Sequence, residues 1–296
     1  MKEIIKIDNL TKNYGQFTAL RDVNLSVAPG EVYGFIGPNG AGKTTTIRVL
    51  LGILKATGGN ATVFGKDVWK DAVELHKKIA YVPGDVNLWS NLTGGEVIDF
   101  FIRLRRCKNE SRKEELIKRF ELDPRKKCRT YSKGNRQKVA LIAAFASDAD
   151  LYILDEPTSG LDPLMERVFQ DCVQEVKDAG KAVFLSSHIL QEVERLCDKV
   201  SIIRDGSIIE TGSMADLRHL TRTSITVQTK EAALGLENVP GVYDIRKESD
   251  SLIFAIETDK LNEVMTFLTV FGISKLECTP PTLEELFMSH YKNTRG

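Results

Sequence analysis

Continuous apolar runs mark short segments along the first part of the chain. They lie at 32–36, 151–154 and 183–185, and an unbroken run of this length is typical of a strand buried on both faces of a parallel sheet. The first run is followed by apolar residues at helical spacing, namely Ile47, Leu50, Leu51 and Leu54. Buried strands followed by such helices predict an α/β fold with a parallel sheet at its core.

Residues from about 86 to 150 carry a helical pattern. Thr93-Gly94-Gly95-Glu96 has the form of a capping box. The apolar residues after it recur at helical spacing and predict one apolar helix face, made of Val97, Phe100, Phe101 and Leu104. Ser132 is a residue type that caps helices, and we expect a helix from about 136 to 149. This stretch therefore predicts a helical subdomain.

The pattern changes again after residue 189. We expect a helix at 189–197 and then a hairpin that turns at Asp205-Gly206, between strands at 200–203 and 208–209. Beyond about residue 221, shorter segments predict strands at 224–228, 242–245, 252–256 and 273–278, and helices at 261–268 and 282–288. The chain is therefore expected to form a large domain, 1–220, and a small α+β domain, 221–296.

Charge is balanced, with 41 Lys+Arg against 41 Asp+Glu and a pI of about 6.9 over 296 residues. The chain therefore has no basic field that would attract nucleic acid. A local basic run, Arg103, Arg105, Arg106 and Lys108, is followed closely by Glu110, Glu114 and Glu115. This mixture favours a solvated helix face and its exit over a nucleic-acid patch.

Neither a membrane span nor a disulfide framework is predicted. No run approaches the roughly 20 apolar residues that span a bilayer, and the N-terminus MKEIIKIDNL carries acids too early for a signal peptide. The five cysteines are scattered and are expected to be reduced thiols. We therefore expect a cytoplasmic protein, with any membrane role arising through a partner.

The loop GPNGAGKTTT, between the first predicted strand and helix, fits GxxxxGK[ST]. Its candidate nucleotide-binding residues are Gly37, Pro38, Asn39, Gly40, Ala41, Gly42, Lys43, Thr44 and Thr45. Glycines let backbone N–H groups converge on phosphate oxygens, and the helix N-terminus adds a favourable dipole. In such a loop Lys43 reaches the β- and γ-phosphates of ATP, and the Thr44 hydroxyl holds Mg²⁺. A flexible turn before a chance lysine is the alternative, which the flanking strand and helix disfavour.

Asp155 and Glu156 end the apolar run 151–154. Open α/β sheets bind ligands at the carboxyl ends of their strands, so Asp155 is a candidate Mg²⁺ ligand, acting through water. Glu156 is a candidate general base for the attacking water. Two acids at a solvated strand end are the alternative, and the P-loop elsewhere in the chain disfavours it.

With these two motifs the sequence resembles the nucleotide-binding subunit of an ABC transporter. Four further stretches support the resemblance: 131–137 resembles the family's signature motif, usually LSGGQ; 159–162 its D-loop; His188 its switch histidine; and Tyr14 the aromatic that stacks on adenine. Their order along residues 1 to about 220 matches the whole cassette. The resemblance implies an α/β P-loop NTPase cassette with a parallel-sheet core, an antiparallel β part and a helical subdomain.

The resemblance also implies a mechanism. Such cassettes dimerise head to tail around two ATP molecules, and hydrolysis releases the dimer. Ser132 and Gly134 would face the γ-phosphate of the ATP held by the opposite subunit, and His188 would contact the same phosphate. Lys43, Glu156 and His188 are then the catalytic candidates. A hydrogen-bonded strand-end histidine and, for Tyr14, an exposed turn aromatic are the alternatives.

Two departures from the family's pattern stand out. Lys133 replaces the usual glycine of the signature, where its side chain must turn outward, and Asn135 replaces the usual glutamine. Just after Pro83 the family has a glutamine that contacts Mg²⁺ and transmits motion to the membrane subunit. This chain has Gly84 there, and Asp85 is the candidate substitute as a metal ligand.

The family's helical subdomain also carries a groove for a coupling helix of the permease. The apolar residues that lie where this groove would be, or that instead form core, are Val86, Leu88, Trp89 and Leu92. The ending PPTLEELFMSHY resembles that of ATPase subunits of drug, antibiotic and sodium exporters. We therefore predict an exporter motor that forms a homodimer and lies on the inner face of the cell membrane through a separately encoded permease.

Two other classes of protein are less consistent with the sequence. A soluble ABC ATPase that acts on ribosomes or DNA commonly carries two cassettes or a coiled-coil insert. This chain has one P-loop, no sustained heptads and neutral charge. A small-molecule P-loop kinase has no need of a signature motif that serves a second subunit.

Overall fold

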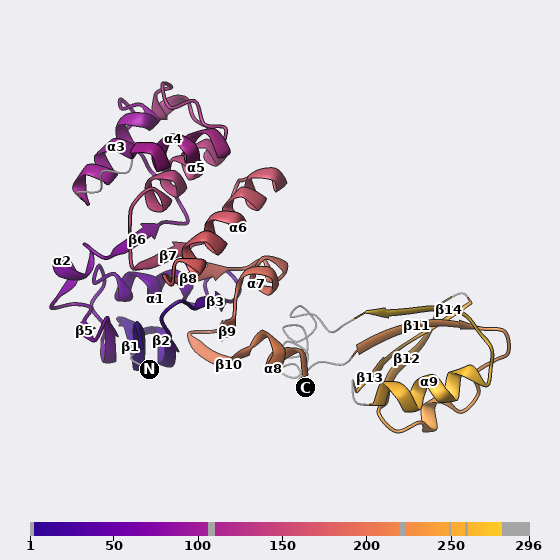
Figure 1. Ribbon diagram of the computed structural model, residues 1–296. Helices are drawn as coiled ribbons and strands as arrows, with labels where there is room; N and C mark the ends of the chain where they lie inside the picture. Colours follow the sequence, from indigo (N-terminus) through magenta and orange to yellow (C-terminus); the bar gives the residue numbers. More distant parts are fainter. Residues whose placement is uncertain (1–2, 106–109, 220–222, 249, 258–259, 280–296) are drawn as a thin grey trace. The chain divides into compact units, whose positions relative to one another are not determined.

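The computed structural model describes residues 3–105, 110–219, 223–248, 250–257 and 260–279. Contacts divide the chain into two compact units, Met1–Thr211 and Gly212–Gly296 (Figure 1). Among the described residues, no helix is both long and apolar enough to cross a bilayer.

A six-stranded sheet forms the centre of the first unit, with the strand order β10-β9-β3-β8-β7-β6. Its strands are β3 (Val32–Ile36), β6 (Ile79–Val82), β7 (Leu151–Asp155), β8 (Ala182–Ser187), β9 (Lys199–Arg204) and β10 (Ser207–Ser213). The pairs β3–β8, β3–β9, β6–β7 and β7–β8 are parallel. Every residue of β3, β7 and β8 is buried, which confirms the prediction from the continuous apolar runs.

The register of this sheet brings three strand ends together. Ile36 at the end of β3 pairs with Ser187 of β8, and Ser186 of β8 pairs with Asp155 at the end of β7. Because the strands are parallel, the loops that follow them leave the same edge of the sheet. The P-loop, Asp155-Glu156 and His188 therefore start side by side.

An antiparallel sheet with the order β2-β1-β4-β5 covers the other side of the P-loop helix α1 (Lys43–Leu50). Its strands are β1 (Ile5–Tyr14), β2 (Phe17–Val27), β4 (Gly58–Val63) and β5 (Lys66–Asp67). One hydrophobic core joins both sheets and α1, and it includes Ile5, Leu20, Phe35, Ile47 and Phe184. This is the antiparallel β part that the family resemblance implied.

The helices of the first unit gather mainly between β6 and β7 in the chain (Figure 1). Between these strands lie α3 (Gly94–Leu104), α4 (Glu110–Arg119), η1 (Cys128–Thr130) and α5 (Lys133–Phe145). Helix α2 (Ala72–Leu75) comes before β6, α6 (Pro163–Asp178) follows β7, and α7 (Leu190–Leu196) follows β8. The capping box at Thr93 and Glu96 is confirmed. The expected bounds 136–149 for α5 are wrong: the helix begins directly after its cap Ser132 and ends at Phe145.

Helix α3 buries a different side from the one that the sequence predicted. Val97 is fully buried as expected, together with Ile98 and Ile102. The other expected apolar positions are exposed, at 47% for Phe100, 36% for Phe101 and 69% for Leu104. The helical periodicity is real, but three of the four residues of the predicted apolar face lie outside the core.

Within its described residues, the second unit contains an antiparallel sheet with the order β12-β13-β11-β14 and a helix, α9, that covers it. Its elements are α8 (Met214–His219), β11 (Thr223–Thr229), η2 (Leu236–Asn238), β12 (Val242–Glu248), β13 (Ser251–Ile256), α9 (Leu261–Thr269) and β14 (Ile273–Thr279). Val264 and Leu268 of α9 pack on Ile225, Val227 and Phe254 of the sheet. The four predicted strands and the helix at 261–268 are confirmed, whereas 282–288 lies outside the described residues.

Candidate nucleotide site

The P-loop has a shape that several of its glycines make possible. A Cβ atom at Gly37 would lie 2.3 Å from the backbone oxygen of Ile203. Gly42, the cap of α1, has φ 114°, and Gly40 has φ 82°. Residues other than glycine rarely adopt such values. The loop therefore wraps closely between the strand and the helix.

Lys43 closes this loop on itself. Its side chain is 5% exposed, and Nζ donates to the backbone oxygens of Gly37 at 2.7 Å and of Pro38 at 3.2 Å. The same Nζ lies 3.3 Å from Oε1 of Glu156. The ammonium is thus held at the mouth of the loop by oxygen atoms, as a phosphate group could also hold it.

Both oxygens of Asp155 are engaged by hydroxyl groups. Thr44 Oγ1 donates to Oδ2 at 2.9 Å, and Ser186 Oγ donates to Oδ1 at 2.5 Å. Hydroxyl and carboxylate oxygens are the ligand types that Mg²⁺ prefers. The Thr44–Asp155 pair therefore fits a magnesium ion, with its remaining ligands left to water and phosphate.

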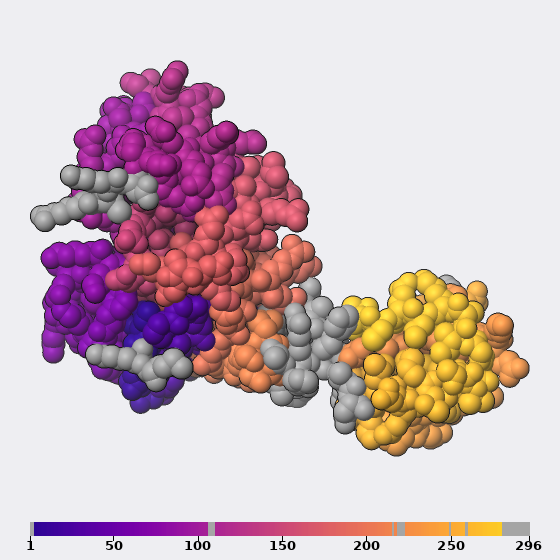
Figure 2. Space-filling view, in the orientation of Figure 1, coloured from indigo at the N-terminus to yellow at the C-terminus, as the bar shows by residue number. Residues whose placement is uncertain are grey.

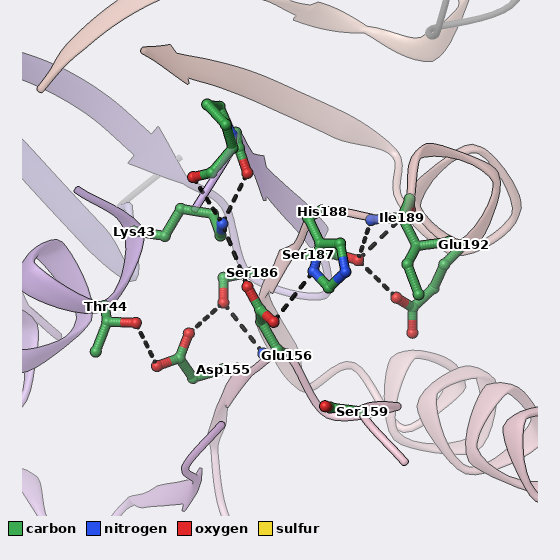
Figure 3. A network of polar contacts seen from close by, with 12 residues as sticks. Lys43, Thr44, Asp155, Glu156, Ser159, Ser186, Ser187, His188, Ile189 and Glu192 are labelled. Carbon is green, nitrogen blue, oxygen red and sulfur yellow. Dashed lines mark hydrogen bonds and ion pairs between the residues drawn. The ribbon is translucent and has the colours of Figure 1, made fainter. Parts of the chain in front are cut away.

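Glu156 stands between two basic groups (Figure 3). One carboxylate oxygen meets Lys43, and the other lies 3.1 Å from Nδ1 of His188. The backbone at Glu156 is left-handed, with φ 47°, and its N–H donates to the oxygen of Ser186 at 3.0 Å. With 24% of its side chain exposed, Glu156 is open to a water molecule.

The signature segment forms the start of helix α5. Ser132 caps α5 and accepts from the N–H of Asn135 at 3.3 Å, which confirms the predicted cap. Lys133 is exposed and turns outward from the helix, and its Nζ donates to Ser159 Oγ at 2.7 Å. A Cβ atom at Gly134 would lie 2.4 Å from the oxygen of Gly160. The signature and the D-loop of one chain therefore touch.

Glu192 is a site residue that the sequence analysis missed. It lies in α7 and is 6% exposed, and its Oε2 accepts from Ser187 Oγ at 2.8 Å. Ser187 Oγ in turn accepts from the N–H of Ile189 at 3.0 Å, so the two residues bracket His188 (Figure 3). Burial, opposed in part by the hydrogen bond from Ser187, raises the pKa of Glu192 to about 7. The sequence did offer a signal for Glu192: it is an acid four residues after His188, in a short predicted helix.

Among the described residues, the side-chain contacts of Tyr14 and Asp85 are with residues outside this cluster. Tyr14 ends β1, is 47% exposed, and has the Lys12 Nζ at 5.1 Å from its ring centre. Asp85 is exposed, and its Oδ2 accepts a hydrogen bond from Asn87 Nδ2 at 3.3 Å. Gly84 is the residue that faces Asp155, because its Cβ would lie 3.7 Å from the Asp155 carboxyl carbon.

A large apolar hollow lies beside the helical subdomain. Its volume is about 810 Å³, and it opens between the purple and magenta atoms of Figure 2. It is lined by residues that lie in or next to helices α1, α2, α3 and α5, among them Leu51, Val73, Leu88, Phe101 and Ala143. The sequence did not decide whether four apolar residues belong to a groove or to the core. Val86 and Leu88 line this hollow, and Trp89 and Leu92 line a second hollow of about 350 Å³.

Comparison with known proteins agrees with this geometry. Residues 20–159 match the model of the ABC transporter family, and residues 212–291 match that of the DrrA1-3-like C-terminal domain of ATP-binding proteins. The chain is 30% identical to the uncharacterized ABC transporter ATP-binding protein YhcH of Bacillus subtilis, over 100% of this chain and 98% of that protein. The chain belongs to the ABC transporter ATP-binding proteins.

Two further ABC proteins carry information about activity. The bacitracin transport ATP-binding protein BcrA of Bacillus licheniformis is 30% identical, over 97% of each chain. A dimeric ATP-binding cassette, MJ0796, in a post-hydrolysis state with ADP and Pi, has a TM-score of 0.64 and 26% identity. That match covers 71% of this chain and 98% of the cassette. The protein is thus an ATPase of the ABC class, with transport proteins among its relatives.

Proposed function

We propose that this ABC ATP-binding subunit is the motor of an exporter, working as a pair of cassettes with a separately encoded permease. The observation that carries the proposal is the cluster of Lys43, Glu156 and His188 at the mouth of the P-loop. Similarity to a bacitracin transport protein over nearly the whole chain supports export. We assign the cassette to 1–220 and an accessory domain to 221–296; the division into compact units at Thr211 supports this.

ATP would bind with its phosphates over the P-loop. Lys43 would exchange the backbone oxygens of Gly37 and Pro38 for β- and γ-phosphate oxygens. Mg²⁺ held by Thr44 and Asp155 would neutralise charge that develops on the phosphates. The ammonium then leaves the Glu156 carboxylate free to accept a proton.

Glu156 acts as the general base of hydrolysis. It is the acid at this strand end whose carboxylate is open to solvent, whereas Asp155 is buried and hydrogen-bonded through both oxygens. A carboxylate within hydrogen-bond reach of water can take its proton as the water attacks the γ-phosphate. His188, whose Nδ1 lies 3.1 Å from Glu156 Oε2, orients this carboxylate and would contact the γ-phosphate of bound ATP.

A second copy of the chain would complete the site. Exposed Ser132 and the backbone of Gly134, at the start of α5, would face the γ-phosphate bound by the partner subunit. Tyr14, about half exposed, offers an aromatic face to adenine. Loss of the γ-phosphate would remove the contacts between the copies and release them.

The apolar hollow is the surface that we assign to the permease. The exposed rings of Trp89, Phe100 and Phe101 lie next to it. Phe100 meets both other rings edge to face, with ring centres 5.4 Å apart for Trp89 and 5.5 Å apart for Phe101. Contiguous exposed apolar surface of this kind marks protein–protein contacts. A cytoplasmic helix of the permease would fill the hollow and hold the subunit at the inner face of the membrane.

Two substitutions test the chemistry. Lys43→Ala removes the phosphate contact, so ATP hydrolysis should be abolished. Glu156→Gln should bind ATP, hydrolyse it very slowly and accumulate as a dimer during gel filtration with ATP. Normal turnover in Lys43→Ala would refute the P-loop assignment. A monomeric, active Glu156→Gln would refute both the general base and the dimer.

The Glu156→Gln variant also tests the partner. We would tag it, solubilise native membranes mildly with ATP present, and identify captured proteins by mass spectrometry. A multi-spanning membrane protein at comparable abundance supports the motor proposal, and Lys43→Ala serves as the control for capture that depends on nucleotide. Ribosomal or DNA-associated proteins without a membrane partner would overturn it.

A further inference from the structure

Lys133 carries a contact that the usual glycine of the signature could not make. It is the first residue of α5, and its Nζ donates to Ser159 Oγ at 2.7 Å. The two residues are 26 positions apart in the chain. A side chain at the start of the signature helix thus reaches the segment that follows Glu156.

The backbones of the same two segments lie in contact beneath this hydrogen bond. A Cβ at Gly134 would be 2.4 Å from the oxygen of Gly160, so only glycine fits there. Gly160 has φ 83°, and a Cβ on it would lie 3.4 Å from Cγ and Cδ of Lys133. The lysine stem therefore lies beside Gly160, next to the place where a side chain on that residue would begin.

A second hydrogen bond joins the same helix to the start of this segment. Gln137 is 1% exposed, and its Nε2 donates to the oxygen of Pro157 at 2.9 Å. Residues four apart lie on the same side of a helix. One side of α5 thus holds both ends of the segment from Pro157 to Ser159, with a buried hydrogen bond at one end and an exposed one at the other.

This segment follows directly after Glu156, the proposed general base, so its position affects where the Glu156 carboxylate points. Glu156 has left-handed backbone geometry, which neighbouring contacts must hold in place. Its N–H is fixed by Ser186 on one side, and the residues after it are fixed by α5. We propose that Lys133 is a positioning residue, which fixes the D-loop through Ser159 and thereby orients the Glu156 carboxylate. The inference rests on the proposed role of Glu156 as general base.

Lys133→Met is the main test, because methionine keeps an unbranched stem over Gly160 and removes the ammonium. Ser159→Ala removes the other partner. We expect each to lower kcat for ATP hydrolysis about fivefold, the effect of one lost hydrogen bond. KM for ATP should stay within about twofold, since the P-loop is untouched. The double variant should be no slower than the slower single variant, and Lys133→Arg should restore most of kcat.

Lys118→Met is the matched control, as Lys118 is an exposed lysine of α4 in the same subdomain, and its kcat should equal that of the unmodified protein. Additive losses in the double variant would overturn the proposal and would point to direct contact of Lys133 with nucleotide. An unchanged kcat in Lys133→Met, or a change confined to KM, would also overturn it. Thermal unfolding of every variant identifies any that fail to fold, and Ser159→Ala then carries the kcat test alone.

Glu156→Gln, assayed in parallel, separates this inference from the proposed function. If Glu156→Gln hydrolyses ATP normally, the general base is wrong, whatever Lys133 does. If Glu156→Gln is inactive and Lys133 and Ser159 show no coupling, only the positioning role fails.

Discussion

Glu192→Gln should stabilise the protein above neutral pH and leave it nearly unchanged near pH 5. Glu192 is 6% exposed, and burial raises its pKa from the ordinary 4.5 to about 7. Glu166 and Glu156 add to this rise by repulsion, while Ser187 opposes it through a hydrogen bond. Glutamine keeps an oxygen that can accept from Ser187 but never ionises.

The sign follows from which state holds the proton. Between pH 4.5 and 7 the folded protein keeps a proton on Glu192 that the unfolded chain has lost. The stability that this proton supplies is full below pH 4.5 and is lost as pH rises through 7. At about 1.4 kcal/mol for each pH unit between those values, the loss reaches about 3 kcal/mol at pH 8. Glu192→Gln avoids it.

The assay is thermal unfolding of both proteins from pH 5 to 8.5 at constant ionic strength. For a unit of this size, about 3 kcal/mol corresponds to a rise in Tm of roughly 6–12 °C at pH 8. Glu114→Gln, a change at an exposed position of α4, controls for the loss of one glutamate. A difference in Tm between Glu192→Gln and the unmodified protein that does not vary with pH would refute the reasoning.

Two further predictions concern packing. Gly37→Ala should lower ATP hydrolysis by about 100-fold, because the new Cβ would lie 2.3 Å from the Ile203 oxygen and displace the P-loop; activity within a few-fold of normal in a steady-state assay would contradict this. Phe254→Ala should cost about 3–5 kcal/mol in the second unit, since its ring is 1% exposed in that small core. Urea unfolding measures that loss, and a cost below about 1 kcal/mol would mean that the core rearranges around the cavity.

The elements that sequence predicted best are those whose signal is contiguous. The P-loop, the strand before Asp155 and the cap at Ser132 each combine a short motif with a local apolar pattern. The structure confirms the strands and the cap that carry them. The same local logic predicted the strands of the second unit.

Contacts between segments that are distant in the chain could not be predicted from local sequence patterns. The hydrogen bond of Lys133 with Ser159 and that of Ser187 with Glu192 depend on how loops meet after folding. Helix α3 shows the same limit in another form. Its periodicity marks an apolar face, but the pattern does not say whether Phe100 meets the core or a surface hollow.

The left-handed backbone at Glu156 has a consequence for how this sequence is maintained. The φ of Glu156 is 47°. A residue other than glycine in this region lowers the stability of the fold by roughly 1–2 kcal/mol. Glycine would suit the backbone better but carries no carboxylate. Selection for folding alone would therefore favour replacing Glu156, and libraries screened only for thermal stability should collect well-folded, inactive proteins at this position.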